Sequence, residues 1–236
     1  KCDLSSMRLF VSGSAPLSKD LFYKLKKVLG HEILERAGMS ESMMNFSNPY
    51  NGERIPGSVG PCLPGVKVRI TDKNFNDVPV GTEGEILIKG PNVFNGYWNK
   101  SSYNKHAFKD GWFITGDVGK IDEKTYVHLI GRSKDVIISG GINIYPREIE
   151  DVIESMPQVK ECAVVGVSDK EFGESVKAYI VLNGSSKLAD DEVIAYCKEH
   201  LASFKKPKYV EFLDALPKNS MGKILKEELR KMLKGK

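Results

Sequence analysis

The pattern of hydrophobic and polar residues changes twice along this chain. Near the start, two short apolar runs flank an amphipathic segment, and the residues that border this segment are Ser18 and Gly30. Serine and glycine are the residue types that commonly begin and end helices. A strand–helix–strand order follows, with a strand expected at 7–12, a helix at 19–29 and a strand at 33–36. This order predicts the closing part of an α/β sheet over residues 1–56.

From residue 57 to residue 131 the pattern becomes one of short alternating runs separated by Gly and Pro. Alternation with a period of two is typical of half-buried strands. The runs lie at 66–70, 84–90 and 126–131. They predict a β-rich subdomain, resembling a small distorted barrel, that completes a larger domain over residues 1–131.

The second change comes after Gly131. Pro146 stands where a helix begins, and apolar residues recur behind it at helical spacing. Strands are expected at 163–167, 177–182 and 209–213, and further helices at 190–201 and 224–233. Residues 132–236 are therefore expected to form a compact α+β domain, whose abrupt boundary favours a hinge over a flexible tether.

Composition narrows the class of protein. The 236 residues are 41% hydrophobic with a net charge of +4, which excludes a disordered chain and gives no reason to expect nucleic-acid binding. No apolar run approaches the roughly 18 residues of a membrane span. The four cysteines lack metal or redox spacing, and the four histidines show no metal spacing. We expect a location with reducing conditions, either the cytoplasm or an organelle lumen.

Three polar strings in the first domain carry candidate chemistry. Gly13-Ser14-Ala15-Pro16-Leu17 forms a strand-to-helix turn, where α/β folds bind ligands. The string 35–42, Glu-Arg-Ala-Gly-Met-Ser-Glu-Ser, follows a strand, and taken alone it is as consistent with an ordinary polar loop as with a functional one. Asp117 ends the string Phe-Ile-Thr-Gly-Asp, where an aspartate by itself is usually a turn residue.

Two more strings lie at and beyond the boundary. The string 131–150, GRSKDVIISGGINIYPREIE, is the longest and most specific, and a simple turn between strands would explain its glycines but not the rest. The string 216–223, LPKNSMGK, ends in Lys223. A lysine in a Lys-rich tail is ordinarily only solvated, so Lys223 becomes a candidate functional residue only because of the string in which it lies.

Together, in this order and spacing, the five strings resemble the signature motifs of the adenylate-forming family of acyl-CoA synthetases, and the resemblance covers the whole chain. It implies ATP, AMP, Mg²⁺ and CoA as cofactors and a carboxylic acid as substrate. The acid would first become an acyl-adenylate and then be transferred to the CoA thiol. The second domain would rotate between the two steps.

The resemblance also assigns roles to single residues. It implies that Ser40, Glu41 and Lys223 are catalytic, with Glu41 on Mg²⁺, that Lys134 is the hinge, and that Gly140 and Gly141 lie beside the CoA arm. The implied nucleotide-binding residues are Ser14, Ala15, Pro16, Glu35, Arg36, Ala37, Gly38, Met39, Asp117 and Arg132. Ala37 departs from the family, which usually has an aromatic ring stacked on the adenine there, and a methyl group cannot stack.

The acid itself is open. The string 43–66 and the strings GPNVFNGYW at 90–98 and FITGDVGKID at 113–122 are similar to malonyl-CoA synthetases, which implies malonate or methylmalonate. The alternatives are a fatty or aryl acid ligase, an adenylation module that loads a carrier protein, and a degenerate, non-catalytic homologue. The family's Ser/Thr/Gly-rich phosphate loop is not found in the chain, so we expect an N-terminal part of the same enzyme as a partner and little turnover by these residues alone.

Overall fold

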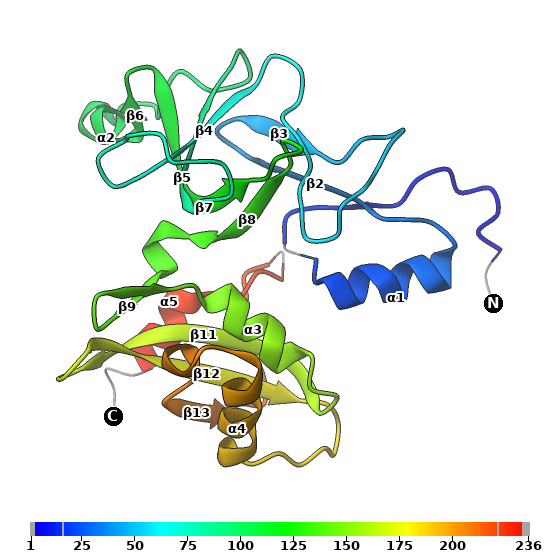
Figure 1. Ribbon diagram of the computed structural model, residues 1–236, viewed down its shortest axis with the longest axis vertical. Helices are drawn as coiled ribbons and strands as arrows, with labels where there is room; N and C mark the ends of the chain where they lie inside the picture. Colours follow the sequence, from blue (N-terminus) through cyan, green and yellow to red (C-terminus); the bar gives the residue numbers. More distant parts are fainter. Residues whose placement is uncertain (1–2, 16, 221, 233–236) are drawn as a thin grey trace. The chain divides into compact units, whose positions relative to one another are not determined.

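The computed structural model describes residues 3–15, 17–220 and 222–232 and divides into two units between Ser133 and Lys134 (Figure 1). Each unit has its own sheets and its own buried hydrophobic clusters. The expected α/β class is confirmed, and the units are described separately below.

The first sheet of unit 1 contains β1 (Val11–Ser12), β2 (Leu34–Met39) and β3 (Met43–Ser47), in that order. β1 pairs with β2 in parallel, while β2 and β3 form an antiparallel hairpin. Helix α1 (Lys19–Leu29) connects β1 to β2 and buries Phe22. Its ends match the expectation, because the Ser18 hydroxyl accepts a hydrogen bond from the Leu21 amide at 3.2 Å and Gly30 is left-handed. Such a cap contributes about 1 kcal/mol.

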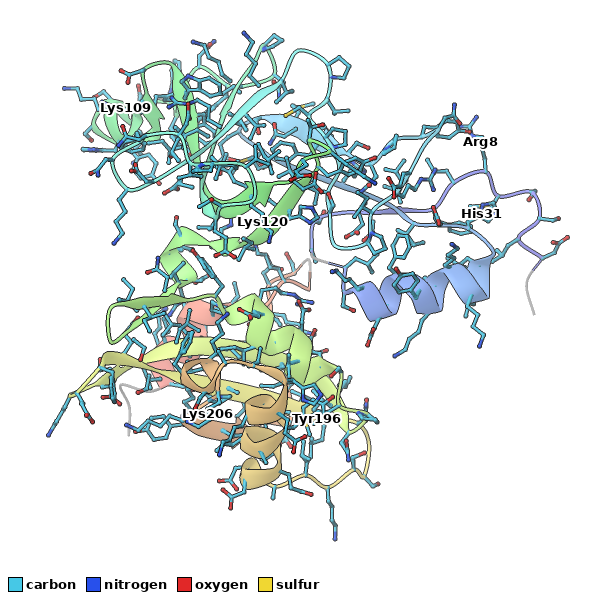
Figure 2. The ribbon with its side chains drawn as sticks, viewed as in Figure 1. Arg8, His31, Lys109, Lys120, Tyr196 and Lys206 are labelled. Carbon is cyan, nitrogen blue, oxygen red and sulfur yellow. The ribbon has the colours of Figure 1, made fainter. Side chains whose placement is uncertain are left out.

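The second sheet of unit 1 is antiparallel and does not close into a barrel among the described residues. Its order is β4 (Lys67–Thr71), β5 (Gly84–Lys89), β7 (Trp112–Ile121), β6 (Phe108–Lys109), and β8 (Val127–Arg132) also pairs with β7. Lys120, labelled in Figure 2, lies opposite His128 across β7 and β8. Helix α2 (Ser101–Ala107) leads into β6. Fully buried Ile88 and Val127 belong to the core of this sheet.

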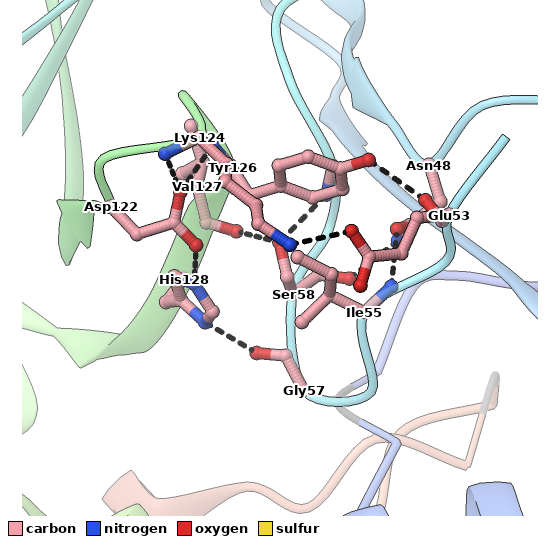
Figure 3. A network of polar contacts seen from close by, with 11 residues as sticks. Asn48, Glu53, Ile55, Gly57, Ser58, Asp122, Lys124, Tyr126, Val127 and His128 are labelled. Atoms are coloured by element: carbon pink, nitrogen blue, oxygen red, sulfur yellow. Dashed lines mark hydrogen bonds and ion pairs between the residues drawn. The ribbon is translucent and has the colours of Figure 1, made fainter.

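A polar network ties the loop at 48–58 to the hairpin of β7 and β8 (Figure 3). The Ser58 hydroxyl donates to the Val127 carbonyl at 2.8 Å, and the Tyr126 hydroxyl donates to the Glu53 carbonyl at 2.8 Å. His128 spans the Asp122 carboxylate at 2.9 Å and the Gly57 carbonyl at 3.2 Å. Because these contacts join segments about 70 residues apart, they hold the loop that packs beside β2 in one place.

Unit 2 is built on one five-stranded sheet with cores on both faces. The strands are β10 (Ile142–Ile144), β9 (Ile137–Ser139), β12 (Gly173–Leu182), β11 (Val159–Asp169) and β13 (Tyr209–Phe212), the last paired with β12. The helices are α3 (Pro146–Glu154), α4 (Asp190–His200) and α5 (Lys226–Met232), with single 3₁₀ turns η1 (Ser133–Asp135) and η2 (Ser203–Lys205). Helices α3 and α4 cover the face that carries Val164, and α5 covers the face that carries Val165.

An ion pair at the edge of these cores links α3 to α5. Lys226 lies 2.6 Å from the Glu150 carboxylate, which also accepts the Val164 amide at 2.8 Å. Glu150 is only 6% exposed, so its charge is compensated by both contacts. Helix α5 is thereby fixed directly after the segment that ends in Lys223.

The structure departs from the sequence expectations mainly in strand lengths. The strand expected at 7–12 is reduced to Val11–Ser12, and the strands expected at 163–167 and 177–182 extend to ten or eleven residues. Strand β7 and helix α2 were not expected. No helix among the described residues is long and apolar enough to cross a membrane.

Candidate active site

The turn after β1 carries the first predicted residues. Because β1 and β2 run in parallel, with Ser12 opposite Glu35, their carboxyl ends reach the same edge of the sheet. Ser14 and Ala15 are exposed at this edge, and Ser14 has a φ of 69°. A left-handed serine is strained, and such strain is found preferentially at functional sites. The predicted residue Pro16 lies outside the described residues.

Glu35, on β2, is turned inward. Its side chain is 6% exposed and accepts a hydrogen bond from the Gly57 amide at 3.2 Å. Burial raises the pKa of Glu35, while the hydrogen bonds from the Gly57 and Leu17 amides oppose that shift. The carboxylate therefore joins β2 to the loop at 48–58, and its contribution to the site is through that loop.

The next residues of β2 alternate between two faces. Ala37 and Met39 pack against the core of the second sheet. Arg36 is exposed on the other face, where its Nη1 atom lies 3.3 Å from the Met44 sulfur. It makes no ion pair with any described carboxylate. The stem of this side chain passes the turn at Gly13, whose Cβ position would lie 3.6 Å from the Arg36 Cγ atom, and its guanidinium contacts Met44.

Gly38 allows the hairpin of β2 and β3 to close. A Cβ atom at this position would lie 1.9 Å from the Met43 carbonyl oxygen, far inside contact distance. Strand pairing shifts register here, between Ala37 and Gly38. The glycine therefore fixes the position of the turn that follows.

That turn contains Ser40, which is exposed, and Glu41, which is half-buried. The Glu41 carbonyl accepts the Phe94 amide at 2.8 Å, and its Oε1 atom accepts the Tyr97 hydroxyl at 2.8 Å. Burial raises the pKa of Tyr97 to about 12, and the hydrogen bond to Glu41 acts in the same direction. The phenol therefore remains a donor at neutral pH. Tyr97 was not among the predicted residues.

Asp117 and Arg132 face one another across β7 and β8. They are paired in register, and the Arg132 Nε atom lies 2.8 Å from the Asp117 Oδ1 atom. Both side chains remain partly exposed, at 24% and 38%. Nearby, burial raises the pKa of Glu85, and the charge of Asp117 adds to that shift. The pair presents a carboxylate and a guanidinium together, which suits a ligand with hydroxyl and phosphate groups.

In unit 2, the predicted hinge residue Lys134 lies in η1, exposed, 3.0 Å from the Glu227 carboxylate on α5. This contact lowers the pKa of Glu227. Its neighbour Asp135 pairs with Arg230 of α5 at 2.8 Å. The hinge segment is therefore tied to α5 by two ion pairs.

Gly140 and Gly141 form the turn between β9 and β10. Their φ angles are 56° and 80°, which only glycine adopts without strain. The Gly140 amide donates to the Phe172 carbonyl at 2.9 Å, and a Cβ atom at Gly141 would meet nothing within 4 Å. The hairpin thus presents a thin, open stretch of backbone.

Lys223 lies in an exposed loop directly before α5. Its main chain is fixed by reciprocal contacts with Asn219, each at 2.9 Å. Its ammonium has no hydrogen-bond or ion-pair partner within the described part of the chain. Met221 of the same motif lies outside that part. The main chain of Lys223 is thus fixed while its ammonium remains available, an arrangement that suits electrostatic stabilisation of a bound anion.

These residues can be tested for a metal site. The described residues contain no group of three or more His, Cys, Asp or Glu side chains that could hold a metal. Glu41 nevertheless suits Mg²⁺, which is commonly held by one or two carboxylates together with substrate phosphates and water. No described cationic side chain pairs with Glu41.

Comparison with known families gives two matches. Residues 1–98 match the model of the AMP-binding enzymes, and residues 148–223 match that of the AMP-binding enzyme C-terminal domain. The first match contains the strings at 13–17 and 35–42, and the second contains the string at 216–223.

Comparison with individual proteins gives relatives whose names are those of acyl-CoA ligases and synthases. The chain is 40% identical over 229 residues to a long-chain-fatty-acid–CoA ligase of Yersinia pestis, covering 97% of this chain and 41% of that protein. It is 40% identical over 232 residues to a feruloyl-CoA synthase of an Amycolatopsis species, covering 97% and 47%. A crystal structure of ATP-bound MatB from Rhodopseudomonas palustris is 50% identical, with a TM-score of 0.93, covering 96% and 46%. The chain therefore spans somewhat less than half the length of these relatives.

Proposed function

This chain belongs to the family of AMP-binding enzymes, and on that premise we propose that it is the C-terminal part of an ATP-dependent acyl-CoA ligase. One observation carries the proposal. Ser40, Glu41, Asp117, Arg132 and Lys223 all lie in strings that resemble the family's motifs, and Ser40 and Lys223 are exposed in the structure. A non-catalytic homologue would not be expected to keep all five of these residues.

For adenylation, we assign the nucleotide to the residues of unit 1. Asp117 would accept hydrogen bonds from the ribose hydroxyls, and Arg132 beside it would contact the phosphate side. Ser40 would donate its hydroxyl to a phosphate oxygen. Glu41 would hold Mg²⁺, whose chemistry is to neutralise charge on the phosphates.

Lys223 would supply the remaining positive charge. The acid carboxylate and the α-phosphate are both anions, so their approach is opposed electrostatically, and a held ammonium lowers that barrier. The main-chain contacts to Asn219 serve this role by fixing the loop while leaving the side chain unpaired.

For the second step, we propose that unit 2 rotates about Lys134 and presents the turn of Gly140 and Gly141 to the CoA thiol arm. The absence of side chains at both positions would let the arm pass close to the backbone. One domain would then serve two half-reactions with two different faces, a hinge motion.

As the acid, we propose a small dicarboxylate such as malonate. MatB, a malonyl-CoA synthetase, is 50% identical to this chain, against 40% for the fatty-acid and feruloyl ligases. A fatty or aryl acid is the competing substrate.

The test uses the complete enzyme, meaning this chain together with the part that its relatives have beyond it. ATP–pyrophosphate exchange is measured with malonate, methylmalonate, butyrate, palmitate and ferulate, and acyl-CoA formation is then measured with the acids that respond. We expect both activities with the two dicarboxylates. Exchange with none of these acids would refute the ligase assignment, and preference for palmitate or ferulate would refute only the choice of acid.

The free thiols of Cys62, Cys162 and Cys197 support a reducing location, and we propose the cytoplasm. Burial raises the pKa of all three thiols, so none is suited to redox chemistry.

A further inference from the structure

A segment distant in sequence holds the turn that carries Glu41. The Phe94 amide donates to the Glu41 carbonyl at 2.8 Å, and the Asn92 side chain donates to the Ser42 carbonyl at 2.7 Å. Asn92 also reaches the Asn45 side chain at 3.0 Å. The main chain at Glu41 and at the following residue is therefore fixed from outside the hairpin.

Tyr97 belongs to this segment and is itself held from two sides. Its amide donates to the Asn104 Oδ1 atom at 2.8 Å, and the Asn104 amide group donates back to the Tyr97 carbonyl at 2.9 Å. Its ring makes edge contacts with Phe94 and Tyr103, at centroid distances of 4.8 and 5.1 Å. The phenol therefore approaches Glu41 in one orientation.

The hydroxyl donates to Oε1 of Glu41, and no described residue donates to Oε2. Outer hydrogen bonds of this kind orient ligand carboxylates and are important for metal affinity. We infer that Tyr97 is a positioning residue of the proposed reaction, occupying one oxygen of Glu41 so that the other is presented to Mg²⁺. This inference rests on the proposed function, because it takes Glu41 as the magnesium ligand.

The test compares Tyr97→Phe with Tyr103→Phe in the complete enzyme. Both changes remove one phenol oxygen from the same aromatic group, but only Tyr97 contacts Glu41. Binding of Mn²⁺ in the presence of ATP is measured by electron paramagnetic resonance, and the Mg²⁺ dependence of exchange is measured at saturating ATP. We expect Tyr97→Phe to weaken Mn²⁺ binding and raise the Mg²⁺ requirement about tenfold. Tyr103→Phe should change neither.

A double-mutant comparison separates positioning from general damage. If Tyr97 acts through Glu41, adding Tyr97→Phe to Glu41→Gln should cause no further loss of Mn²⁺ binding. Unchanged Mn²⁺ binding in Tyr97→Phe, or an additive loss in the double variant, would overturn the inference. Unchanged binding in Glu41→Gln would instead refute the metal assignment within the proposed function.

Asn104→Ala provides a second route if Tyr97→Phe does not fold. It keeps the phenol but removes the amide contacts that hold Tyr97. We expect a smaller weakening of Mn²⁺ binding in the same direction. Normal Mn²⁺ affinity in Asn104→Ala, together with a Tyr97→Phe protein that does not fold, would count against a positioning role.

Discussion

The two units hold their candidate residues in different ways. In unit 1, Glu41 and Asp117 are half-buried, and each is held by a partner from another segment, Tyr97 or Arg132. In unit 2, Lys223 and the turn of Gly140 and Gly141 lie exposed on loops, held through their main chain alone. The difference suits a division of labour in which one unit binds the nucleotide in a preformed site and the other presents groups that act in turn.

The largest expected effect tests the exposed cation. Lys223→Ala should lower adenylation about 10²-fold or more, because it removes charge stabilisation that no neighbouring group replaces. Thioester formation from supplied acyl-adenylate should be retained. Lys218→Ala is the control, since it removes the same charge from the same loop but from an ammonium already paired with Glu161 at 2.6 Å. Equal losses in both half-reactions would contradict the division between the units.

Asp117→Asn tests the preformed site. The change removes the proposed charged acceptor of the ribose hydroxyls, and hydrogen bonds to charged groups contribute about 1.5–3 kcal/mol. We expect the KM for ATP to rise at least tenfold. Asp122→Asn, on the same hairpin but bonded to His128, should alter thermal stability and leave the KM for ATP unchanged. A KM that responds equally to both would indicate a structural role for Asp117.

Gly141→Leu tests the open hairpin of unit 2. We expect thioester formation to fall about tenfold or more while adenylation is retained, because a side chain would obstruct the CoA arm. Gly184→Leu is a matched control. Both glycines are left-handed with nothing within 4 Å of the Cβ position, so both substitutions carry similar backbone strain. Loss of thioester formation in both variants would assign the effect to strain.

The smallest effect concerns Glu35. Its pKa is raised in the folded state by burial, so its contribution favours folding at low pH and is lost as the pH rises through the raised pKa. Glu35→Gln should therefore raise the melting temperature slightly at neutral pH and lose that advantage in acid. Glu83→Gln, at an exposed position of the same unit, should shift it at neither pH. A destabilised Glu35→Gln at neutral pH would show that its hydrogen bonds outweigh the burial of charge.

Local signals predicted the ends of α1 and the start of α3, but not the short helix α2. Ser18 and Gly30 mark the two ends of α1, and Pro146 marks the start of α3, because caps and proline act within a few residues of themselves. The strands were harder to predict from the sequence. Strand β7 contains Gly116 with a φ of 71° and two register shifts, so strict alternation is lost. The β-rich subdomain could be recognised, but whether its sheet closes into a barrel depends on pairing between distant strands.

The candidate site, like the fold, could be predicted from the sequence only where the signal is local. The motifs located Glu41, Asp117, Arg132 and Lys223, and their roles stay predictions. Tyr97 was missed although it lies in a recognised string, because its contact with Glu41 joins residues 56 positions apart. Inward placement of Glu35 was missed because the alternation of β2 alone does not show which face is covered.

The tight approach at Gly38 restricts how this protein could be redesigned. Since even a methyl group would lie 1.9 Å from the Met43 carbonyl oxygen, position 38 is closed to a mutagenesis library aimed at acid selectivity. Arg36, two residues earlier on the same strand, is exposed and leaves more room for variation. A mutagenesis library at this hairpin should therefore vary position 36 and leave the glycine unchanged.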